Sequence, residues 1–231
     1  EGHEIVELLK EMWLSEGAAP TIGVVTFNRP QSDLISDLLD EQCRKDQAFG
    51  ARFQQEVARK DQNQDVGFFV KNLENVQGDE RDIMIFSTTF GRSNSGAFYR
   101  KFGPVGAERG ERRLNVAVTR AKKKVVIVGS MPIEEISDAM SLLSTPGSAL
   151  RPRCYLQLYL AYSKAVSDMN EERVQQILDR LMRRGQSSQP IGGLPDSPFE
   201  EEVRQCLQNL GHTVDCQVGE SGFKIDLAVR H

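Results

Sequence analysis

Three arginines stand close together where this sequence passes directly from one structural pattern into another. Arg112, Arg113 and Arg120 lie among apolar residues that recur at helical spacing across positions 112 to 123. A run of β-branched residues from 124 to 129 follows with no loop before it, and this run predicts a buried strand. The arginines could be a solvated helix face that only keeps the protein soluble. Alternatively, one of them is directed at an anion.

The charge of the chain is unevenly distributed, because a formal net charge of −4 conceals a basic stretch. Residues 99 to 124 contain nine Lys or Arg and two Glu. Such a patch favours contact with phosphate groups. A basic surface balanced by acids elsewhere would have the same composition, so charge alone leaves both interpretations open.

The composition indicates a globular chain, since 39% of its 231 residues are hydrophobic and can form a core. No apolar run is long enough to span a membrane or resembles a signal peptide, so we expect a cytoplasmic protein without membrane contact. The four cysteines form no CxxC pair, which argues for reduced thiols and against a zinc site. The three histidines form no recognisable constellation, which argues against His-based acid/base catalysis.

Apolar segments that predict strands alternate with amphipathic segments that predict helices. The expected strands cover 21–27, 67–70, 82–87 and 124–128, and the expected helices cover 4–14, 31–46 and 112–123. This alternation predicts an α/β fold with a mainly parallel sheet over residues 1–140. Residues 141–195 predict a linker and a helical segment. Residues 196–231 predict a helix and two strands, an α+β segment too small for a core of its own and therefore a truncated domain.

Three stretches occur in the order and spacing of known motifs. They are GVVTFN at 23–28, VQGDERD at 76–82 and RRLNVAVTRA at 112–121. In this order they resemble motifs IV, V and VI of superfamily 1 helicases, which lie in the second RecA-like lobe of those proteins. The resemblance covers roughly residues 1 to 135 and is most complete in motif VI.

The resemblance implies that ATP binds between two lobes and that Arg120 is the arginine finger for its γ-phosphate. It also implies that Glu80 bonds the nucleotide ribose, after a turn made by Gln77 and Gly78. In an ordinary loop, Gly78 would only supply backbone freedom. Arg113 also matches motif VI, where it could bind the nucleotide or only orient the motif.

Family members often have an arginine early in the motif IV helix, where this sequence has Ser32. Arg29 could substitute for it at the phosphate, or Arg120 could act alone. Contacts with the nucleic-acid backbone are implied for residues near motifs IV and V and in the loop at 92–110, which we call the basic loop. These residues are Thr26, Asn72, Arg92, Arg100 and Lys101.

The sequence has no G-x-x-x-x-G-K-[ST] loop and no Walker B acid pair. We therefore expect this chain alone to hold neither ATP nor Mg²⁺ and to be inactive as an ATPase. In the full-length protein, a preceding N-terminal RecA-like lobe would supply the phosphate loop and the Mg²⁺ ligands. Nucleic acid, with DNA favoured over RNA, is the expected partner.

The last segment resembles the start of a restriction-endonuclease-like domain of the PD-(D/E)XK group, similar to the very-short-patch-repair endonucleases. The stretches that carry this resemblance are DSPFEEEV at 196–203 and GFKIDLAV at 222–229. The resemblance implies that Glu200, or Glu202 as the next choice, and Asp226 are ligands of a catalytic Mg²⁺. An acidic cluster favoured by the helix dipole would explain the glutamates without a metal.

Two other functions remain compatible with the sequence. The lobe could be a catalytically silent module that binds nucleic acid. It could also belong to a different P-loop-type enzyme whose Arg-rich helix serves another nucleotide. A Walker A lobe directly before Glu1 would separate the helicase hypothesis from both.

Overall fold

The computed structural model describes residues 1–15, 19–92, 95–96, 102–136, 152–182, 198–220 and 223–230. The chain divides into two compact units, Glu1–Val174 and Gln175–His231, and each is described by itself. No helix in these ranges is long and apolar enough to cross a membrane.

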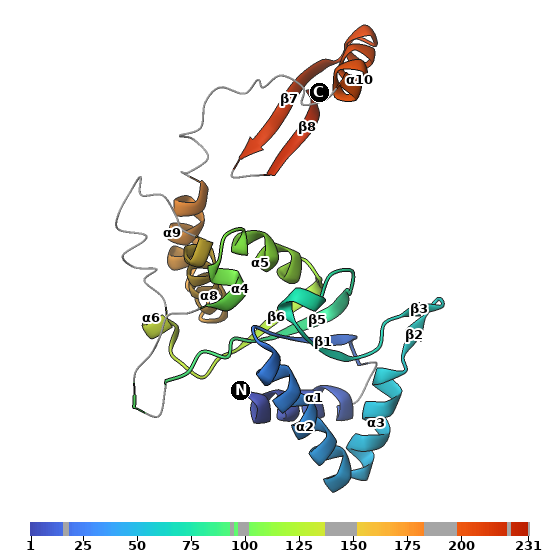
Figure 1. The fold of residues 1–231 in the computed structure, drawn as a ribbon, viewed down its shortest axis with the longest axis vertical. Coiled ribbons are helices and arrows are strands. Elements are labelled where there is room, and N and C mark those ends of the chain that lie inside the picture. Colours follow the sequence, from blue (N-terminus) through green and yellow to red (C-terminus); the bar gives the residue numbers. More distant parts are fainter. Residues whose placement is uncertain are drawn as a thin grey trace. The chain divides into compact units, whose positions relative to one another are not determined.

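A parallel sheet forms the centre of the first unit (Figure 1). Its strands are β4 (Phe69–Asn72), β1 (Ile22–Thr26), β5 (Arg81–Ser87) and β6 (Ala121–Val128), in that spatial order. The carboxyl ends are in register, because Thr26 lies opposite both Asn72 and Ser87, and Ser87 lies opposite Val128. The expected α/β fold with a parallel sheet is therefore confirmed.

Helices cover both faces of this sheet (Figure 1). One face carries α1 (Gly2–Leu14), α2 (Arg29–Lys45) and α3 (Gln47–Val57), and the other carries α4 (Gly103–Gly106), α5 (Gly110–Val118) and α8 (Pro152–Ser167). Neighbouring residues of β1 divide between the two cores: Val24 packs with the first helix group and Val25 with the second. Because both faces are covered, all five residues of β1 are buried, as is typical of central parallel strands.

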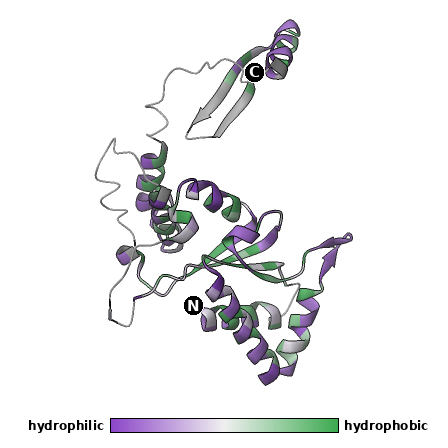
Figure 2. Ribbon diagram, viewed as in Figure 1, coloured by the Kyte–Doolittle hydropathy of each residue, from purple (hydrophilic) through white to green (hydrophobic). Residues whose placement is uncertain are grey.

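Polar caps and turns set the boundaries on the first face. The Asn28 side chain accepts a hydrogen bond from the Gln31 amide and starts α2, and the Asp46 side chain does the same for α3 through the Phe49 amide. After α3 a short hairpin follows, made of β2 (Lys60–Asp61) and β3 (Gln64–Asp65). Figure 2 shows this hairpin as hydrophilic, in contrast to the apolar strands of the sheet.

Two element boundaries differ from the expected ones. The helix expected to continue to residue 123 ends at Val118, and Ala121 is already in β6, opposite Arg81. Pairing with β5 thus replaces helical bonding, although the apolar spacing continues through Ala121. The strand expected at 67–70 begins at Phe69, because the amides of Gly67 and Phe68 donate to Asp65 and Glu56 instead of the sheet.

The remaining elements are short or lie toward the end of the chain. They are η1 (Leu73–Asn75), α6 (Ile133–Ile136), α9 (Glu171–Met182), α10 (Pro198–Asn209), β7 (Thr213–Glu220) and β8 (Phe223–Arg230). β7 and β8 form an antiparallel hairpin. The helix and two strands expected after residue 196 are therefore present.

Candidate functional site

Arg120 and Glu80, which the sequence assigns to one nucleotide site, meet in the structure. Arg120 follows the last turn of α5 and directly precedes β6, and Glu80 directly precedes β5. The Arg120 Nη1 lies 3.2 Å from the Glu80 Oε1, and the two side chains are 23% and 48% exposed. The Arg120 Nε also donates to the Val116 carbonyl at 3.0 Å. The pair thus lies at the amino ends of two adjacent strands and remains open to solvent.

The turn before Glu80 is open as well. Gly78 has a φ of +90° with free space around its α-carbon, so its backbone conformation, and not packing, favours glycine there. Gln77 and Gly78 are exposed, whereas Val76 is fully buried in the core and anchors the turn. The polar groups of residues 77–80 are therefore exposed at the edge of the sheet, while the buried Val76 side chain holds the turn in place.

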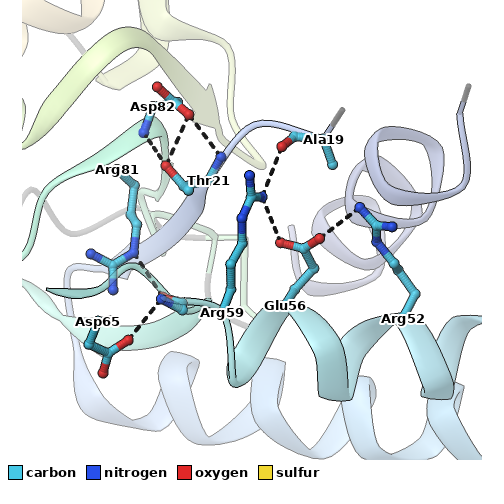
Figure 3. A network of polar contacts seen from close by, with 9 residues as sticks. Ala19, Thr21, Arg52, Glu56, Arg59, Asp65, Arg81 and Asp82 are labelled. Atoms are coloured by element: carbon cyan, nitrogen blue, oxygen red, sulfur yellow. Dashed lines mark hydrogen bonds and ion pairs between the residues drawn. The ribbon is translucent and has the colours of Figure 1, made fainter. Parts of the chain in front are cut away.

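Arg81, the residue after Glu80, is a buried anchor that the motif comparison did not single out. Its side chain, drawn in Figure 3, donates from Nε to the Gly67 carbonyl at 2.8 Å. It also donates from Nη1 to the Glu80 carbonyl at 2.8 Å, and the residue is 4% exposed. Its guanidinium stacks on Phe69, 4.9 Å from the ring centroid. Burial lowers the pKa of the Arg81 guanidinium, and Asp79 and Asp65 oppose this shift. A cation at the start of a buried strand was the available signal.

Asp82 ties together the starts of three strands, and Figure 3 shows its hydrogen bonds with Thr21. Its Oδ2 accepts from the Thr21 amide at 3.0 Å and from the Thr21 hydroxyl at 3.1 Å, just before β1. Its Oδ1 pairs with the Lys123 Nζ of β6 at 3.0 Å. Burial alone would raise the pKa of Asp82, but the Thr21 amide, Lys123 and the Thr21 hydroxyl together lower it. This clamp fixes the strands that carry Glu80 and Arg120.

The residues predicted to contact nucleic acid near motifs IV and V lie at the carboxyl ends. Thr26 and Asn72 are side by side in register on β1 and β4. The buried Thr26 hydroxyl donates to the Asn28 carbonyl at 2.7 Å, and the Asn72 side chain caps η1 through the Glu74 amide. Both side chains are therefore already engaged in local turns.

Arg29 also follows the carboxyl end of β1, whereas Arg120 precedes the amino end of β6. Because the strands are parallel, the two arginines belong to opposite edges of the sheet. Arg29 is exposed, and its Nε lies 3.9 Å from the Asp33 Oδ2. The structure thus does not bring Arg29 to the Arg120–Glu80 pair.

Two other arginines that the sequence singled out donate hydrogen bonds to nearby backbone carbonyls. The Arg113 Nη1 donates to the Pro104 carbonyl at 3.1 Å, so it fastens the segment before α5. Arg92 donates to the Gly96 carbonyl at 2.9 Å and pairs with Glu135. Arg100 and Lys101 lie outside the described residues.

The candidate metal ligands of the last segment lie on different elements. Glu200 and Glu202 are in α10, where the first is half-buried and the second exposed, and Asp226 is in β8. The Asp226 side chain lies outside the described part of the chain. Within that part, no group of three or more His, Cys, Asp or Glu is arranged to hold a metal ion.

A hollow of about 700 Å³ lies along the free edge of β6, beside α8. Its lining includes Lys124, Ile127, Leu160 and Lys164, and none of the residues that the motifs single out. Its position on the edge strand separates it from the amino-end site, so we do not assign the nucleotide to it.

The covered parallel sheet defines an α/β lobe, and the arginine–glutamate pair lies at its amino edge. Residues 1–132 match a protein-family model described as an AAA domain, and the chain belongs to this family.

Relatives of known sequence are described as helicases. An uncharacterized ATP-dependent helicase of Mycoplasma genitalium, MG140, is 35% identical over 174 residues, which cover 75% of this chain and 14% of that protein. Its Mycoplasma pneumoniae homolog is 35% identical over 173 residues, or 74% of this chain. The putative ATP-dependent RNA helicase ECM32 of Saccharomyces cerevisiae is 30% identical over 159 residues, or 60% of this chain. The chain spans 14% of the length of each of these relatives.

Among solved structures, the crystal structure of T. fusca Cas3 is similar with a TM-score of 0.33 and 11% identity, covering 91% of this chain and 23% of that one. A similarity this low carries no argument about fold or function.

Proposed function

We propose that the chain is the second RecA-like lobe of an ATP-dependent superfamily 1 helicase or translocase that acts on nucleic acid. The observation that carries the proposal is the solvent-open pair of Arg120 and Glu80 at the amino ends of β6 and β5. Membership of the AAA domain family and the helicase descriptions of the relatives support it.

The pair is suited to switching between two states. A solvent-exposed ion pair contributes about 0–1 kcal/mol, so a triphosphate can readily draw Arg120 away from Glu80. The guanidinium would then neutralise charge that develops on the transferred phosphoryl group, where catalysis depends mainly on position and electrostatics. The freed Glu80 carboxylate would accept hydrogen bonds from the ribose. Arg81 and Asp82 would keep both positions fixed during this exchange.

Mg²⁺ is expected to accompany ATP and to neutralise its β- and γ-phosphate oxygens. The described residues do not form a site that fits the ion, since no suitable group of three ligands occurs there. We therefore assign its protein ligands to the preceding lobe. In ATP turnover, the roles proposed for this chain belong to the side chains of Arg120 and Glu80 and to the residues that position them.

The carboxyl ends of the strands are proposed to face the nucleic acid, with DNA favoured over RNA. Support comes from Arg92, whose side chain is exposed. Thr26 and Asn72 mark the strand ends, where their side chains hold local turns. Ligands of open α/β sheets commonly bind outside the carboxyl ends of strands. The segment from α10 to β8 is proposed as the beginning of a nuclease-like domain, with Glu200, or Glu202 as the next choice, and Asp226 as its metal ligands.

The test is ATP turnover by the full-length protein in the presence of nucleic acid. Arg120→Ala should reduce kcat by about 10³-fold or more, as the loss of an arginine finger does, with a much smaller effect on ATP binding. Arg120→Lys should recover little, because it keeps the charge but lacks the planar fork. The matched control is Arg44→Ala, at an exposed position near the end of α2 and outside the three motifs. If Arg120→Ala turns over ATP within a few-fold of wild type, the lobe is a silent module or serves another reaction.

A further inference from the structure

The carboxylate of Glu1 gathers five hydrogen bonds at the carboxyl ends of β5 and β6. Oε2 accepts from the Ser87 hydroxyl at 2.5 Å and the Thr89 amide at 2.9 Å. Oε1 accepts from the Thr88 hydroxyl at 3.1 Å and from the Ser130 amide and hydroxyl at 2.9 and 3.0 Å. Ser87 and Thr88 are 0% and 1% exposed. A carboxylate with this many donors is saturated and holds the two strand ends together.

This carboxylate also sets the direction of a hydrogen-bond relay that ends on Gln31, in the first turn of α2. A carboxylate accepts hydrogen bonds but donates none, so the single hydroxyl hydrogen of Ser87 must point to Glu1. The Ser87 oxygen can then only accept, and it does so from the Gln31 Nε2 at 3.1 Å. The orientation of the Gln31 amide is therefore determined by the network. Its Oε1 and the second hydrogen on Nε2 make no hydrogen bond within the described ranges.

A pocket of about 250 Å³ lies beside this relay. It lies between the start of α1, the first turns of α2 and the residues after β5 and β6, and Gln31 is part of its lining. Its apolar wall consists of Leu34, Leu38 and Phe90. Leu34 is 48% exposed, so part of this apolar wall is accessible from solvent. The pocket therefore combines an apolar wall with one oriented amide.

The lining favours a planar base over a phosphate. No Lys or Arg is among the lining residues, whose one basic side chain is the imidazole of His3, and the Glu1 carboxylate adds a negative charge. The volume is below the roughly 300–1,000 Å³ of pockets for drug-sized ligands, so a single ring system fits better than a whole nucleotide. An amide with its carbonyl oxygen and one N–H free matches adenine, which offers an N6 donor beside the N7 acceptor.

We propose that this pocket binds an adenine base of a single nucleic-acid strand, with Gln31 as the residue that recognises it and Glu1 as a positioning residue acting through Ser87. The proposal rests on the proposed function, because it requires a strand along the carboxyl ends of the sheet. Neighbouring bases would be held without sequence preference by backbone contacts and stacking. The lobe would thus prefer adenine at one position of the strand.

The experiment compares two labelled oligonucleotides of equal length that differ only in the 6-amino group of every base. One is oligo(dA), and in the other every adenine is replaced by purine, which has the same ring and N7 but no N6 donor. Fluorescence anisotropy at low salt should show that oligo(dA) binds the chain about tenfold more tightly, the effect of one good amide–adenine pair. Free adenosine is titrated in parallel, to distinguish a base of the strand from the base of a free nucleotide.

Three variants test whether the preference for adenine arises at Gln31. Gln31→Met keeps the side-chain length but removes both amide groups, so both oligonucleotides should bind it equally. Glu1→Gln introduces a group that both donates and accepts, so the relay loses its fixed direction and the preference should fall several-fold while oligonucleotide binding persists. Gln42→Met is the control, because it makes the same change on the same helix at a residue outside the pocket lining. It should keep the full preference.

The outcomes separate this inference from the proposed function. Equal binding of the two oligonucleotides by the wild-type chain would overturn the pocket but not the proposed nucleic-acid contact. A preference that persists in Gln31→Met would also overturn the pocket. Undetectable binding of either oligonucleotide would overturn the proposed nucleic-acid contact, and this inference with it. If adenosine binds with the same Gln31 dependence while the oligonucleotides do not differ, the pocket holds the base of a free nucleotide and the strand assignment is wrong.

Discussion

Two neighbouring arginines at the amino edge of the sheet should respond very differently to substitution. Arg81 is buried and donates two hydrogen bonds to backbone carbonyls, whereas Arg120 lies at the surface in an ion pair with Glu80. Arg81→Met and Arg120→Met each remove one positive charge, so the net charge of the two variants is the same. We predict that the first variant loses about 3 kcal/mol of its free energy of unfolding and the second at most about 1 kcal/mol.

The magnitude follows from the contacts. Arg81→Met leaves the carbonyls of Gly67 and Glu80 without their charged donor, at about 1–2 kcal/mol each in a buried site. Loss of the contact with the Phe69 ring adds about 0.5–1 kcal/mol, and the apolar methionine side chain recovers part of the total. A net loss of about 3 kcal/mol is expected. For Arg120→Met, loss of a partly exposed ion pair costs about 0–1 kcal/mol.

Trp13 provides the assay, because it is the only tryptophan of the chain and lies 3% exposed in the first core. Its ring packs against Phe49 and Phe68, so its fluorescence reports unfolding of the unit that contains the sheet. Urea titrations at pH 7 should place the free energy of unfolding of Arg81→Met about 2 kcal/mol or more below that of Arg120→Met. Equal stabilities within about 0.5 kcal/mol would refute the assignment of Arg81 as the anchor and Arg120 as the free group.

Three further predictions concern the clamp, the basic loop and the last segment. The pKa of Asp82 is lowered on folding, so its stabilising contribution is present at pH 7 and is lost as pH falls below about 4. The difference in unfolding free energy between wild type and Asp82→Asn, measured through Trp13 fluorescence, should therefore shrink over that pH range. A difference that stays constant would contradict the clamp. Arg92→Glu should lower the slope of log affinity for single strands against log salt by about 1 or more, and an unchanged slope would show that the basic loop is only a solvated surface. In a protein extended beyond residue 231, Asp226→Ala should abolish Mg²⁺-dependent cleavage and leave ATP turnover intact, whereas surviving cleavage would remove the nuclease assignment.

The strands and the order of the fold could be predicted from the sequence because their apolar runs are local. The run at 124–128 lies within β6, and the expected strand at 82–87 lies within β5. The resemblance also placed Glu80 and Arg120 at one site, and the two side chains are paired in the structure. These features can be recognised within short segments of the sequence, without knowing which other segments pack against them.

The anchors could not be predicted, because their partners are distant in the sequence. Asp82 bonds Thr21, 61 residues away, and the Glu1 carboxylate bonds Ser130, 129 residues away. No local pattern distinguishes a surface acid from one that ties strand ends together. Arg29 shows the same limit: motif spacing suggested a phosphate ligand, but the direction of β1 puts it at the opposite edge from Arg120. Which edge a loop occupies is decided by the parallel topology, and not by the residues of the loop.

The short connection between α5 and β6, only Thr119 and Arg120, has a mechanical consequence for Arg120. The Arg120 amide still bonds the Ala117 carbonyl of the helix, while the Arg120 carbonyl accepts the Arg81 amide at 3.1 Å and joins the strand pairing. The residue is therefore held from both sides by regular structure, with no flexible linker that could let it drift. At the other end of α5, a β-carbon on Gly110 would lie 1.9 Å from the Val105 carbonyl oxygen, so the start of this helix is fixed by a close backbone approach. An arginine finger requires a backbone that stays in place while the side chain moves, because catalysis by charge neutralisation depends on position. A two-residue turn that is hydrogen-bonded to the helix on one side and to the strand pairing on the other provides such a backbone.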